Sequence, residues 1–438
     1  MVNTKIPRRI TTALINSLSV GVVPRIGLEY VAVGRKNEIE SMLADLDNIS
    51  EGGGAFRLIA GRYGSGKSFL MQIIRNNAME RGYVVADCDL SPERRFSGTK
   101  GQGLATYREL MKNLSTKTIP DGGALDIILQ KWVFNIQTQI VSKDGISPES
   151  SEFNKAMEAK VFSVINAMET MVHGYDFATI ILNYWKGIRD LDDTLKQNAV
   201  RWLRGEFSTK MEARKIMNVS TIIDDENWYD YIKLMAGFVH QIGYKGLIVF
   251  FDEAVNLYKI PNSISRQNNY ERLLSMFNDI MQGKTSYLGF YIGATNQLVE
   301  DERRGLYSYD ALRSRLVENR FSTDERQDNS STVLRLATLS HEELFVLLGR
   351  LQTIHSTHFN YEPKLTDAQM AGFLNLILSK MGSDSLLTPR DLTRDFLGML
   401  NILHQNSDVT FEDLLNKGIT VSSSNEAAEL DEYAEFDV

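Results

Sequence analysis

The sequence contains only one cysteine, Cys88, and eight prolines among 438 residues. A single cysteine cannot form an internal disulfide, and the chain therefore fits the reducing conditions of the cytoplasm. No run of about 18 apolar residues is present, so no transmembrane helix is predicted, and the basic N-terminus lacks the apolar run of a signal peptide. The scarcity of proline, which breaks helices, favours a largely helical protein.

Basic residues are not in excess either. The chain has 48 Lys and Arg against 56 Asp and Glu, which gives a net charge of −8. This balance argues against a surface that is basic throughout, while leaving room for a local basic groove. Apolar residues make up 43% of the chain and charged residues 24%, as in ordinary folded soluble proteins. A chain of this length is expected to form two or three domains.

Five short apolar segments predict buried strands. They read "FRLIA" (56–60), "YVVADCDL" (83–90), "GLIVFFDE" (246–253), "YLGFYIGAT" (287–295) and "VLRLATL" (333–339). Their nearly continuous apolar character is typical of parallel strands that are covered on both faces. Helical patterns such as "KSFLMQIIRNNAMERG" and "YERLLSMFNDIMQG" alternate with them and end in glycine. The alternation predicts an α/β domain with three layers around a parallel sheet.

Helical sequence interrupts and follows this α/β pattern. The second and third predicted strands are separated by about 155 residues, far more than one crossover needs. We therefore predict a helical insertion domain at 102–243, inside an α/β core formed by 33–101 and 244–339. Residues 1–32 form an N-terminal segment. Residues 340–418 predict a small helical C-terminal domain, and the acidic residues 419–438 predict a disordered tail.

The segment "GRYGSGKS" (61–68) matches the phosphate-binding pattern G-x-x-x-x-G-K-[ST] between a predicted strand and a predicted helix. The glycines allow backbone amides to turn inward around phosphate oxygens. Lys67 is expected to reach the β- and γ-phosphates of a nucleotide, and the Ser68 hydroxyl to ligate Mg²⁺. The predicted nucleotide-binding residues of this loop are Gly61, Gly64, Ser65, Gly66, Lys67, Ser68 and Phe69.

Polar residues follow the third and fourth predicted strands. Asp252 and Glu253 end "GLIVFFDE"; Asp252 would hold Mg²⁺, and Glu253 would orient or deprotonate an attacking water. Thr295 and Asn296 end the next strand, at the sheet edge where ligands bind. Asn296 would contact the γ-phosphate and the water, or would cap the following turn. A glutamate beside the metal-binding aspartate favours hydrolysis of the nucleotide.

Three arginines are candidates to complete the site. Arg313 and Arg315 in "YSYDALRSRL" (307–316) either stabilise the transition state on a neighbouring subunit or form a basic helix end. In "TPRDLTRDF" (388–396), Thr388 is a predicted helix cap and Pro389 occupies the first helical position. Arg390 follows directly, where it would lean over a bound nucleotide or remain solvated.

These motifs, in this order and followed by a helical lid, resemble the core of AAA+ ATPases, which belong to the ASCE class of P-loop proteins. The segment "VAVGRKNEIESML" is similar to the "GR-x-x-E" segment of the initiator-like and STAND-like AAA+ branches. This resemblance implies that Gly34 and Arg35 lie near the adenine and the ribose of ATP.

The same resemblance implies roles for other residues. Asn296, with Thr295 as the alternative, corresponds to the residue called sensor 1. Arg315, with Arg313 as the alternative, corresponds to the arginine finger that acts on a neighbouring subunit. Arg390 is similar to the sensor 2 arginine of the lid.

Several segments outside the generic ATPase motifs narrow the resemblance. They are "RRITTALINSLSVGVVP", "RWLRGE", "GYKGLIVFFDEAVNLYK" and "RRGLYSYDALRSRL". With "VAVGR" and "GRYGSGKSFL", they resemble the ATP-binding P-loop proteins of BREX-type phage-resistance loci, the BrxD type in particular, over roughly residues 6–400. Membership implies a cytoplasmic, Mg²⁺-dependent ATP hydrolase. It would form a homo-oligomer and act with other BREX proteins in a defence complex on DNA.

Two other functions remain open on the same motifs. One is a nucleotide-dependent switch with slow turnover, and the other is a DNA-binding adaptor that recruits a methyltransferase or a helicase. The basic, glycine-rich segment "SPERRFSGTKGQG" (91–103) fits either contacts with phosphates of double-stranded DNA or an ordinary surface loop. Cys88 is expected to be a buried apolar residue. His355 and His358 form H-x-x-H without the further ligands that zinc requires.

Overall fold

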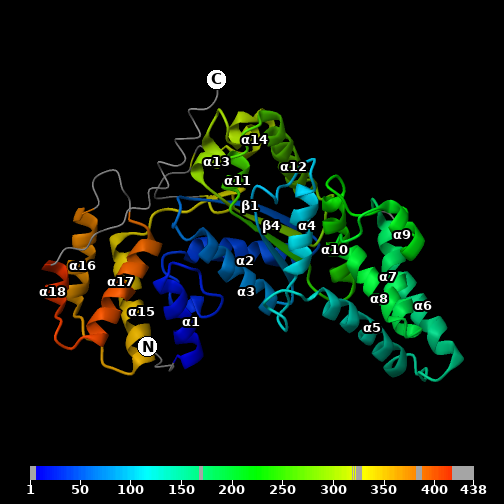
Figure 1. Cartoon of the computed structure of the whole chain (residues 1–438), viewed down its shortest axis with the longest axis horizontal. Coiled ribbons are helices and arrows are strands. Elements are labelled where there is room, and N and C mark those ends of the chain that lie inside the picture. Colours follow the sequence, from blue (N-terminus) through cyan, green and yellow to red (C-terminus); the bar gives the residue numbers. More distant parts are fainter. Residues whose placement is uncertain are drawn as a thin grey trace.

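The computed structural model of the chain describes residues 6–166, 171–317, 319, 321, 328–380 and 387–416, and the predicted tail at 419–438 lies outside them. Its centre is a parallel sheet with helices around it (Figure 1). The sheet has five strands, all parallel, in the order β2-β3-β4-β1-β5. The strands are β1 (Gly54–Ala60), β2 (Val84–Asp89), β3 (Leu247–Asp252), β4 (Leu288–Ala294) and β5 (Val333–Arg335). All five predicted strands are confirmed. The edge strand β5 is shorter than expected and pairs only with the end of β1.

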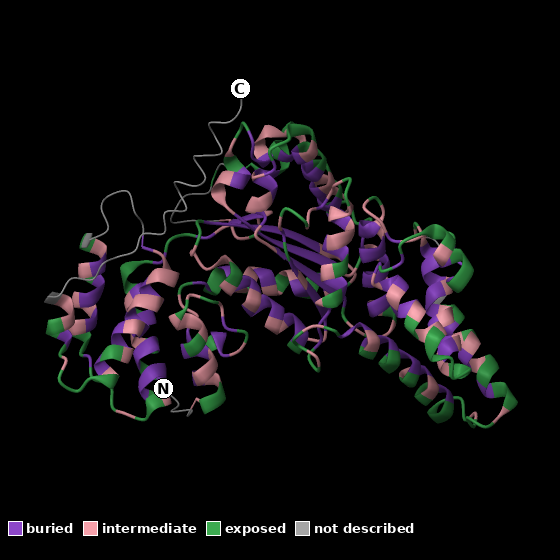
Figure 2. Ribbon diagram, viewed as in Figure 1, coloured by how far each residue is buried: buried purple, intermediate pink, exposed green. Residues whose placement is uncertain are grey.

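Helices cover both faces of the sheet, and the strands between them are buried (Figure 2). On one face, Ile59 and Ile248 share a buried cluster with Leu46 and Ile74 of two helices. Those helices are α2 (Lys36–Ser50) and α3 (Lys67–Glu80). The other face is covered by α4 (Gln102–Lys112), α10 (Trp228–Gln241) and α12 (Ser263–Met281). The predicted α/β architecture with a parallel sheet is confirmed.

Helices make up most of the described chain between β2 and β3. While α4 and α10 lie on the sheet, the remaining helices extend away from it (Figure 1). They are α5 (Leu125–Ser142), α6 (Ser151–Asn166), α7 (Gly174–Arg189), α8 (Asp193–Leu203) and α9 (Lys210–Met217). Trp132 of α5 packs edge-on against Phe238 of α10, with ring centroids 5.3 Å apart. The extended helices therefore share one continuous hydrophobic cluster with the sheet.

A second hydrophobic cluster joins the two ends of the described chain. Leu14 of α1 (Arg8–Ser19) is buried with Leu348 of α15 and Phe396 of α17. The C-terminal helices are α15 (His341–Phe359), α16 (Asp367–Lys380), α17 (Pro389–Gln405) and α18 (Phe411–Asn416). Thr388 caps α17 by accepting a hydrogen bond from the backbone of Asp391, as predicted. The N-terminal segment is thus packed on the helical lid.

Within the described ranges, no helix combines the length and the apolar character that crossing a bilayer requires.

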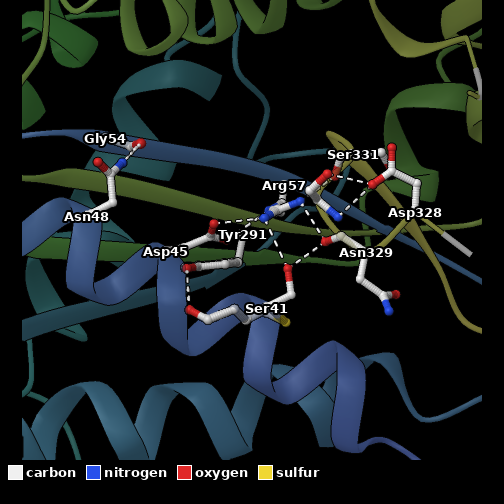
Figure 3. A network of polar contacts seen from close by, with 11 residues as sticks. Ser41, Asp45, Asn48, Gly54, Arg57, Tyr291, Asp328, Asn329 and Ser331 are labelled. Atoms are coloured by element: carbon white, nitrogen blue, oxygen red, sulfur yellow. Dashed lines mark hydrogen bonds and ion pairs between the residues drawn. The ribbon is translucent and has the colours of Figure 1, made fainter.

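A buried arginine ties β1 to its neighbours. Arg57 is 7% exposed, and its Nη2 and Nε atoms lie 2.7 Å and 2.8 Å from the two carboxylate oxygens of Asp45 in α2 (Figure 3). The same guanidinium donates to the carbonyl oxygens of Asn329, at 3.1 Å, and Ser331. Because these two residues precede β5, one side chain fixes α2 and the edge strand to β1. Arg57 stands four residues before Gly61.

We expect Arg57→Ala to lower the free energy of unfolding by about 3–5 kcal/mol, since the Asp45 carboxylate, whose side chain is only 15% exposed, loses its partner. The matched control is Arg81→Ala, whose ion pair with Asp47 has side chains 33% and 68% exposed. That pair should contribute less than about 1 kcal/mol. Denaturant unfolding of both variants measures the difference, and equal losses would contradict the assignment.

Candidate phosphate-binding site

A pocket opens beside the loop that follows β1, where the lid and the N-terminal segment meet the sheet. One half of the pocket is polar and the other is apolar. Leu347 and Leu351 of α15 line the apolar half with Val22 and Val31 of the N-terminal segment. The predicted site residues that line the pocket are Arg35, Gly64, Ser65, Gly66, Lys67, Ser68, Phe69, Asp252, Glu253, Thr295 and Arg390.

The loop between β1 and α3 has the backbone of a phosphate cradle. Gly64 and Gly66 have φ angles of 73° and 98°, in the left-handed region that favours glycine. A Cβ atom on Gly66 would meet no atom within 4 Å, so this side of the loop is open to a ligand. α3 begins at Lys67 directly after the loop, and a helix N-terminus attracts anions.

The Ser65 hydroxyl independently indicates a ligand-binding site. Its Oγ atom is buried and has no hydrogen-bond partner within the part of the chain that the structure describes. Buried polar atoms without partners are uncommon in proteins. A ligand with acceptor oxygens, such as a phosphate in the loop, would satisfy this hydroxyl.

Lys67 carries the positive charge of the loop. Its Nζ atom donates to the carbonyl oxygens of Gly61, at 3.0 Å, and Arg62, at 2.8 Å. Burial lowers the pKa of Lys67, and the nearby carboxylates of Asp252 and Glu253 act in the opposite direction. A partly buried ammonium group favours an anionic ligand, because withdrawing a charge from water is costly unless the charge is paired.

The Asp252 carboxylate joins the loop to β3. Its Oδ2 atom accepts a hydrogen bond of 2.5 Å from the Ser68 hydroxyl, and its Oδ1 atom accepts one of 2.8 Å from the Glu253 backbone N–H. A Cβ atom on Gly293 would lie 2.4 Å from Oδ1, so the neighbouring strand needs glycine there. Hydroxyl and carboxylate oxygens are the ligands that Mg²⁺ prefers. Ser68 and Asp252 therefore fit a magnesium site.

Glu253 has a left-handed backbone with a φ angle of 55°. This conformation is uncommon for a residue with a side chain, and such strained residues cluster at functional sites. Glu253 lines the pocket and influences the pKa of Lys67. The structure therefore places a carboxylate beside the phosphate loop, where it is able to act on a water next to a bound phosphate.

Three residues that the sequence predicts in the site are not among the described residues that line the pocket: Gly34, Gly61 and Asn296. A Cβ atom on Gly34 would lie 2.5 Å from a Glu343 carboxylate oxygen, so Gly34 allows close packing against α15. Gly61 supplies a carbonyl oxygen to Lys67. Asn296 begins α13 (Asn296–Glu300), which Thr295 caps by accepting a hydrogen bond from the Leu298 backbone. Thr295 therefore contacts the pocket directly, and Asn296 follows it.

Arg313 and Arg315 lie on α14 (Asp310–Leu316) with exposed side chains. Arg313 Nη2 lies 2.5 Å from Glu302 Oε1, and Arg315 Nε lies 3.2 Å from Asn278 Oδ1. Neither residue is among the described residues that line the pocket of its own chain. Their action on a neighbouring subunit stays a prediction.

Arg390 reaches from the lid to two other parts of the site. Its Nε atom donates to the Gly21 carbonyl oxygen at 2.7 Å, and its guanidinium lies 4.8 Å from the centroid of the Tyr63 ring. Such a cation–π contact is favourable. Sequence reasoning missed Tyr63, although its place inside the loop was a usable signal. It also missed the lining residues Gly21–Val23, which approach the pocket only because α1 packs on the lid.

The other residues singled out in the sequence have structural partners. Cys88 is buried as predicted, and burial raises its pKa to about 12, so the thiol stays protonated. The two ring nitrogens of His355 contact the Tyr361 hydroxyl and the Asn401 side chain. In the segment 91–103, the Asn269 side chain accepts hydrogen bonds from the backbone of Phe96 and Ser97, which anchors this loop to α12.

The phosphate loop after β1, joined through Ser68 and Asp252 to β3 of a parallel sheet, defines a P-loop nucleotide-binding protein. The model of one protein family, described as BREX system ATP-binding protein BrxC/D, matches residues 6–418, and the chain therefore belongs to this family. The match confirms the resemblance to the BREX family found in the sequence, and it covers the BrxC and BrxD types together. Comparison with curated proteins finds no match.

We expect Gly293→Ala to weaken Mg²⁺-dependent ATP binding by about tenfold to a hundredfold, as loss of a residue that orients a metal ligand does. The added Cβ would displace the Asp252 carboxylate from Ser68 and from the Glu253 backbone. Gly398→Ala in α17 is the matched control, since its Cβ would meet no atom within 4 Å. Titration of ATP with and without Mg²⁺ measures the change. Wild-type affinity in Gly293→Ala would contradict the assigned role.

We also expect ATP binding to take up protons at alkaline pH. The pKa of Lys67 is lowered by burial, and bound phosphates should raise it again. ATP affinity should therefore fall as the pH rises through the lowered pKa of the ligand-free protein. Calorimetric titration in buffers of different ionisation enthalpy measures the uptake. In Lys67→Arg the guanidinium stays protonated and the uptake should vanish; equal uptake in both proteins would refute the assignment to Lys67.

Proposed function

We propose that this protein is a Mg²⁺-dependent ATP hydrolase of the AAA+ class that drives or gates a BREX defence complex acting on DNA. Its membership in the BREX ATP-binding family supports the nucleotide and the biological context. The observation that carries the hydrolysis is the position of Glu253, which lines the pocket beside an aspartate bonded to the P-loop serine.

The pocket accommodates ATP with its phosphates at the loop and its base in the apolar half. The loop amides, the Ser65 hydroxyl and Lys67 would bind the phosphates. Val31, Leu347 and other apolar side chains would enclose the adenine, because nucleotide bases bind well between apolar surfaces. Arg35 lines the same pocket and would contact the ribose or the adenine, as the sequence resemblance implies.

The residues of this chain divide the chemical work among themselves. Ser68 and Asp252 would hold Mg²⁺, which when bound neutralises the charge that develops on the phosphates. Lys67 holds the β- and γ-phosphates in line for attack. Glu253 accepts a proton from the attacking water. Thr295, with Asn296 beside it, would orient this water; the pocket favours Thr295 for the direct contact.

The AAA+ assignment is supported by two features. β4 lies between β1, which leads into the phosphate loop, and β3, which ends in Asp252, as an ASCE sheet requires. The helical lid also places Arg390 in the pocket, where a sensor 2 arginine would act. We propose a cytoplasmic homo-oligomer in which the exposed Arg315, or Arg313 beside it, acts on the nucleotide of the next subunit.

The test is ATP turnover per subunit measured against protein concentration, with and without double-stranded DNA. Turnover should rise with concentration, because a neighbouring subunit supplies an arginine, and it should rise further with DNA. Glu253→Gln should lower turnover by about a hundredfold or more while ATP still binds, and Lys67→Ala should abolish binding.

Arginine variants separate the parts of this proposal. If Arg313→Ala and Arg315→Ala both leave turnover unchanged in the assembled protein, neither arginine acts as the arginine finger and that assignment is wrong. If turnover is slow and changes neither with protein concentration, nor with DNA, nor in Glu253→Gln, the protein is better described as a nucleotide-dependent switch than as a hydrolase. BREX defence that survives Lys67→Ala would instead favour a DNA-binding adaptor.

A further inference from the structure

The left-handed backbone of Glu253 needs support from its surroundings. Residues with side chains occupy this region only where neighbouring groups hold them there. Glu253 lies in the turn between β3 and the short helix α11 (Val255–Tyr258). On its N-terminal side, its backbone N–H is fixed by Asp252 Oδ1 at 2.8 Å. On its C-terminal side, the Ala254 N–H donates to the Gly293 carbonyl oxygen of β4 at 3.2 Å.

Asn256 supplies the support for the Glu253 carbonyl group. Its backbone N–H donates to the Glu253 carbonyl oxygen at 3.0 Å, and its side-chain Nδ2 donates to the same oxygen at 3.1 Å. The other Nδ2 hydrogen is directed to the Leu90 carbonyl oxygen at 2.9 Å. Because both partners of the side chain are carbonyl acceptors, only the NH₂ end of the amide fits here.

Leu90 connects this amide to the strand on the other side of β3. It directly follows β2, and its backbone N–H donates to the Asp252 carbonyl oxygen at 2.9 Å. The Asn256 amide therefore bridges the end of β2 and the turn after β3. Asp252, Glu253 and Asn256 are held together by bonds that run through a single backbone turn.

We propose that Asn256 is a positioning residue that holds the strained backbone of Glu253 and thereby aims its carboxylate at the water beside the terminal phosphate. Asn256 is not among the described residues that line the pocket, so it acts through Glu253 and not on ATP. Without its side-chain amide, the Glu253 backbone would relax toward ordinary φ values, and the carboxylate would turn away from the water. This inference rests on the proposed hydrolysis of ATP.

The first test compares Asn256→Ala and Asn256→Asp with wild type. The Asp variant keeps the shape of the side chain but loses both donors, and it sets a carboxylate against two carbonyl oxygens. Both variants should lower kcat by about tenfold to a hundredfold, less than removal of the base itself. KM and the equilibrium binding of Mg²⁺ and ATP should stay within about twofold, since the phosphate and metal ligands are untouched.

Asn227→Ala is the matched structural control. The Asn227 amide likewise donates to a backbone carbonyl oxygen, that of Ile222 at 2.9 Å, but it lies in the turn before α10 and not in the pocket. Thermal unfolding of the Asn256 and Asn227 variants measures the purely structural cost of losing such an amide. The inference expects kcat to fall only in the Asn256 variants. If kcat falls in the Asn256 and Asn227 variants alike, in proportion to the stability that each loses, the inference is overturned.

A double-mutant cycle with Glu253→Gln decides whether Asn256 acts through the carboxylate. In the Glu253→Gln background, Asn256→Ala should leave the residual turnover unchanged, because the group that it positions is already lost. Equal fold-losses in both backgrounds would overturn the inference. If Glu253→Gln turns over ATP slowly while Asn256→Ala keeps the wild-type rate, this inference is overturned and the proposed hydrolysis stands. Wild-type turnover in Glu253→Gln would overturn the proposed role of Glu253 in hydrolysis and this inference with it.

Discussion

The candidate site depends on the two hydrogen bonds that the Asp252 carboxylate accepts, because each of its oxygens binds a different segment of the chain. Oδ2 accepts from the Ser68 hydroxyl of the phosphate loop, and Oδ1 accepts from the backbone of Glu253. The proposed metal site and the proposed water-activating group therefore depend on one side chain. It has room only because the facing position on β4 is Gly293. The fold therefore acts on Ser68, Asp252 and Glu253 by fixing where these residues lie.

Contacts around the phosphate loop hold it at one edge of the sheet. Arg57 fixes β1 against α2 and against the approach to β5, so the strand that leads into the phosphate loop is held on both sides. At the opposite side of the pocket, Arg390 joins the lid to Tyr63 of the loop and to Gly21 of the N-terminal segment. A nucleotide in this pocket would contact the core, the lid and the N-terminal segment at once.

Much of the fold was predictable because its signals are local. Strands buried on both faces read as apolar runs, and the phosphate loop has a fixed pattern of glycine, lysine and serine. The Thr388 cap of α17 followed from the same kind of local rule. The roles of Gly293 and Asn256 had no such signal. Gly293 matters through contact with a residue of another strand, and Asn256 through a bond to Leu90, far away in the sequence.

The sequence by itself determined the class of sheet, the phosphate loop and the acidic pair at the end of β3, since each depends on residue types at short spacing. Its resemblance to the BREX family, carried by segments along most of the chain, was confirmed by the family match. Only the tertiary structure decided which of these residues share a pocket. It brought Thr295 rather than Asn296 to the lining and placed Arg313 and Arg315 on an exposed helix. It also folded the N-terminal segment over the nucleotide site. The physical reason is that these outcomes depend on packing between segments hundreds of residues apart, and spacing along the chain carries no information about that packing.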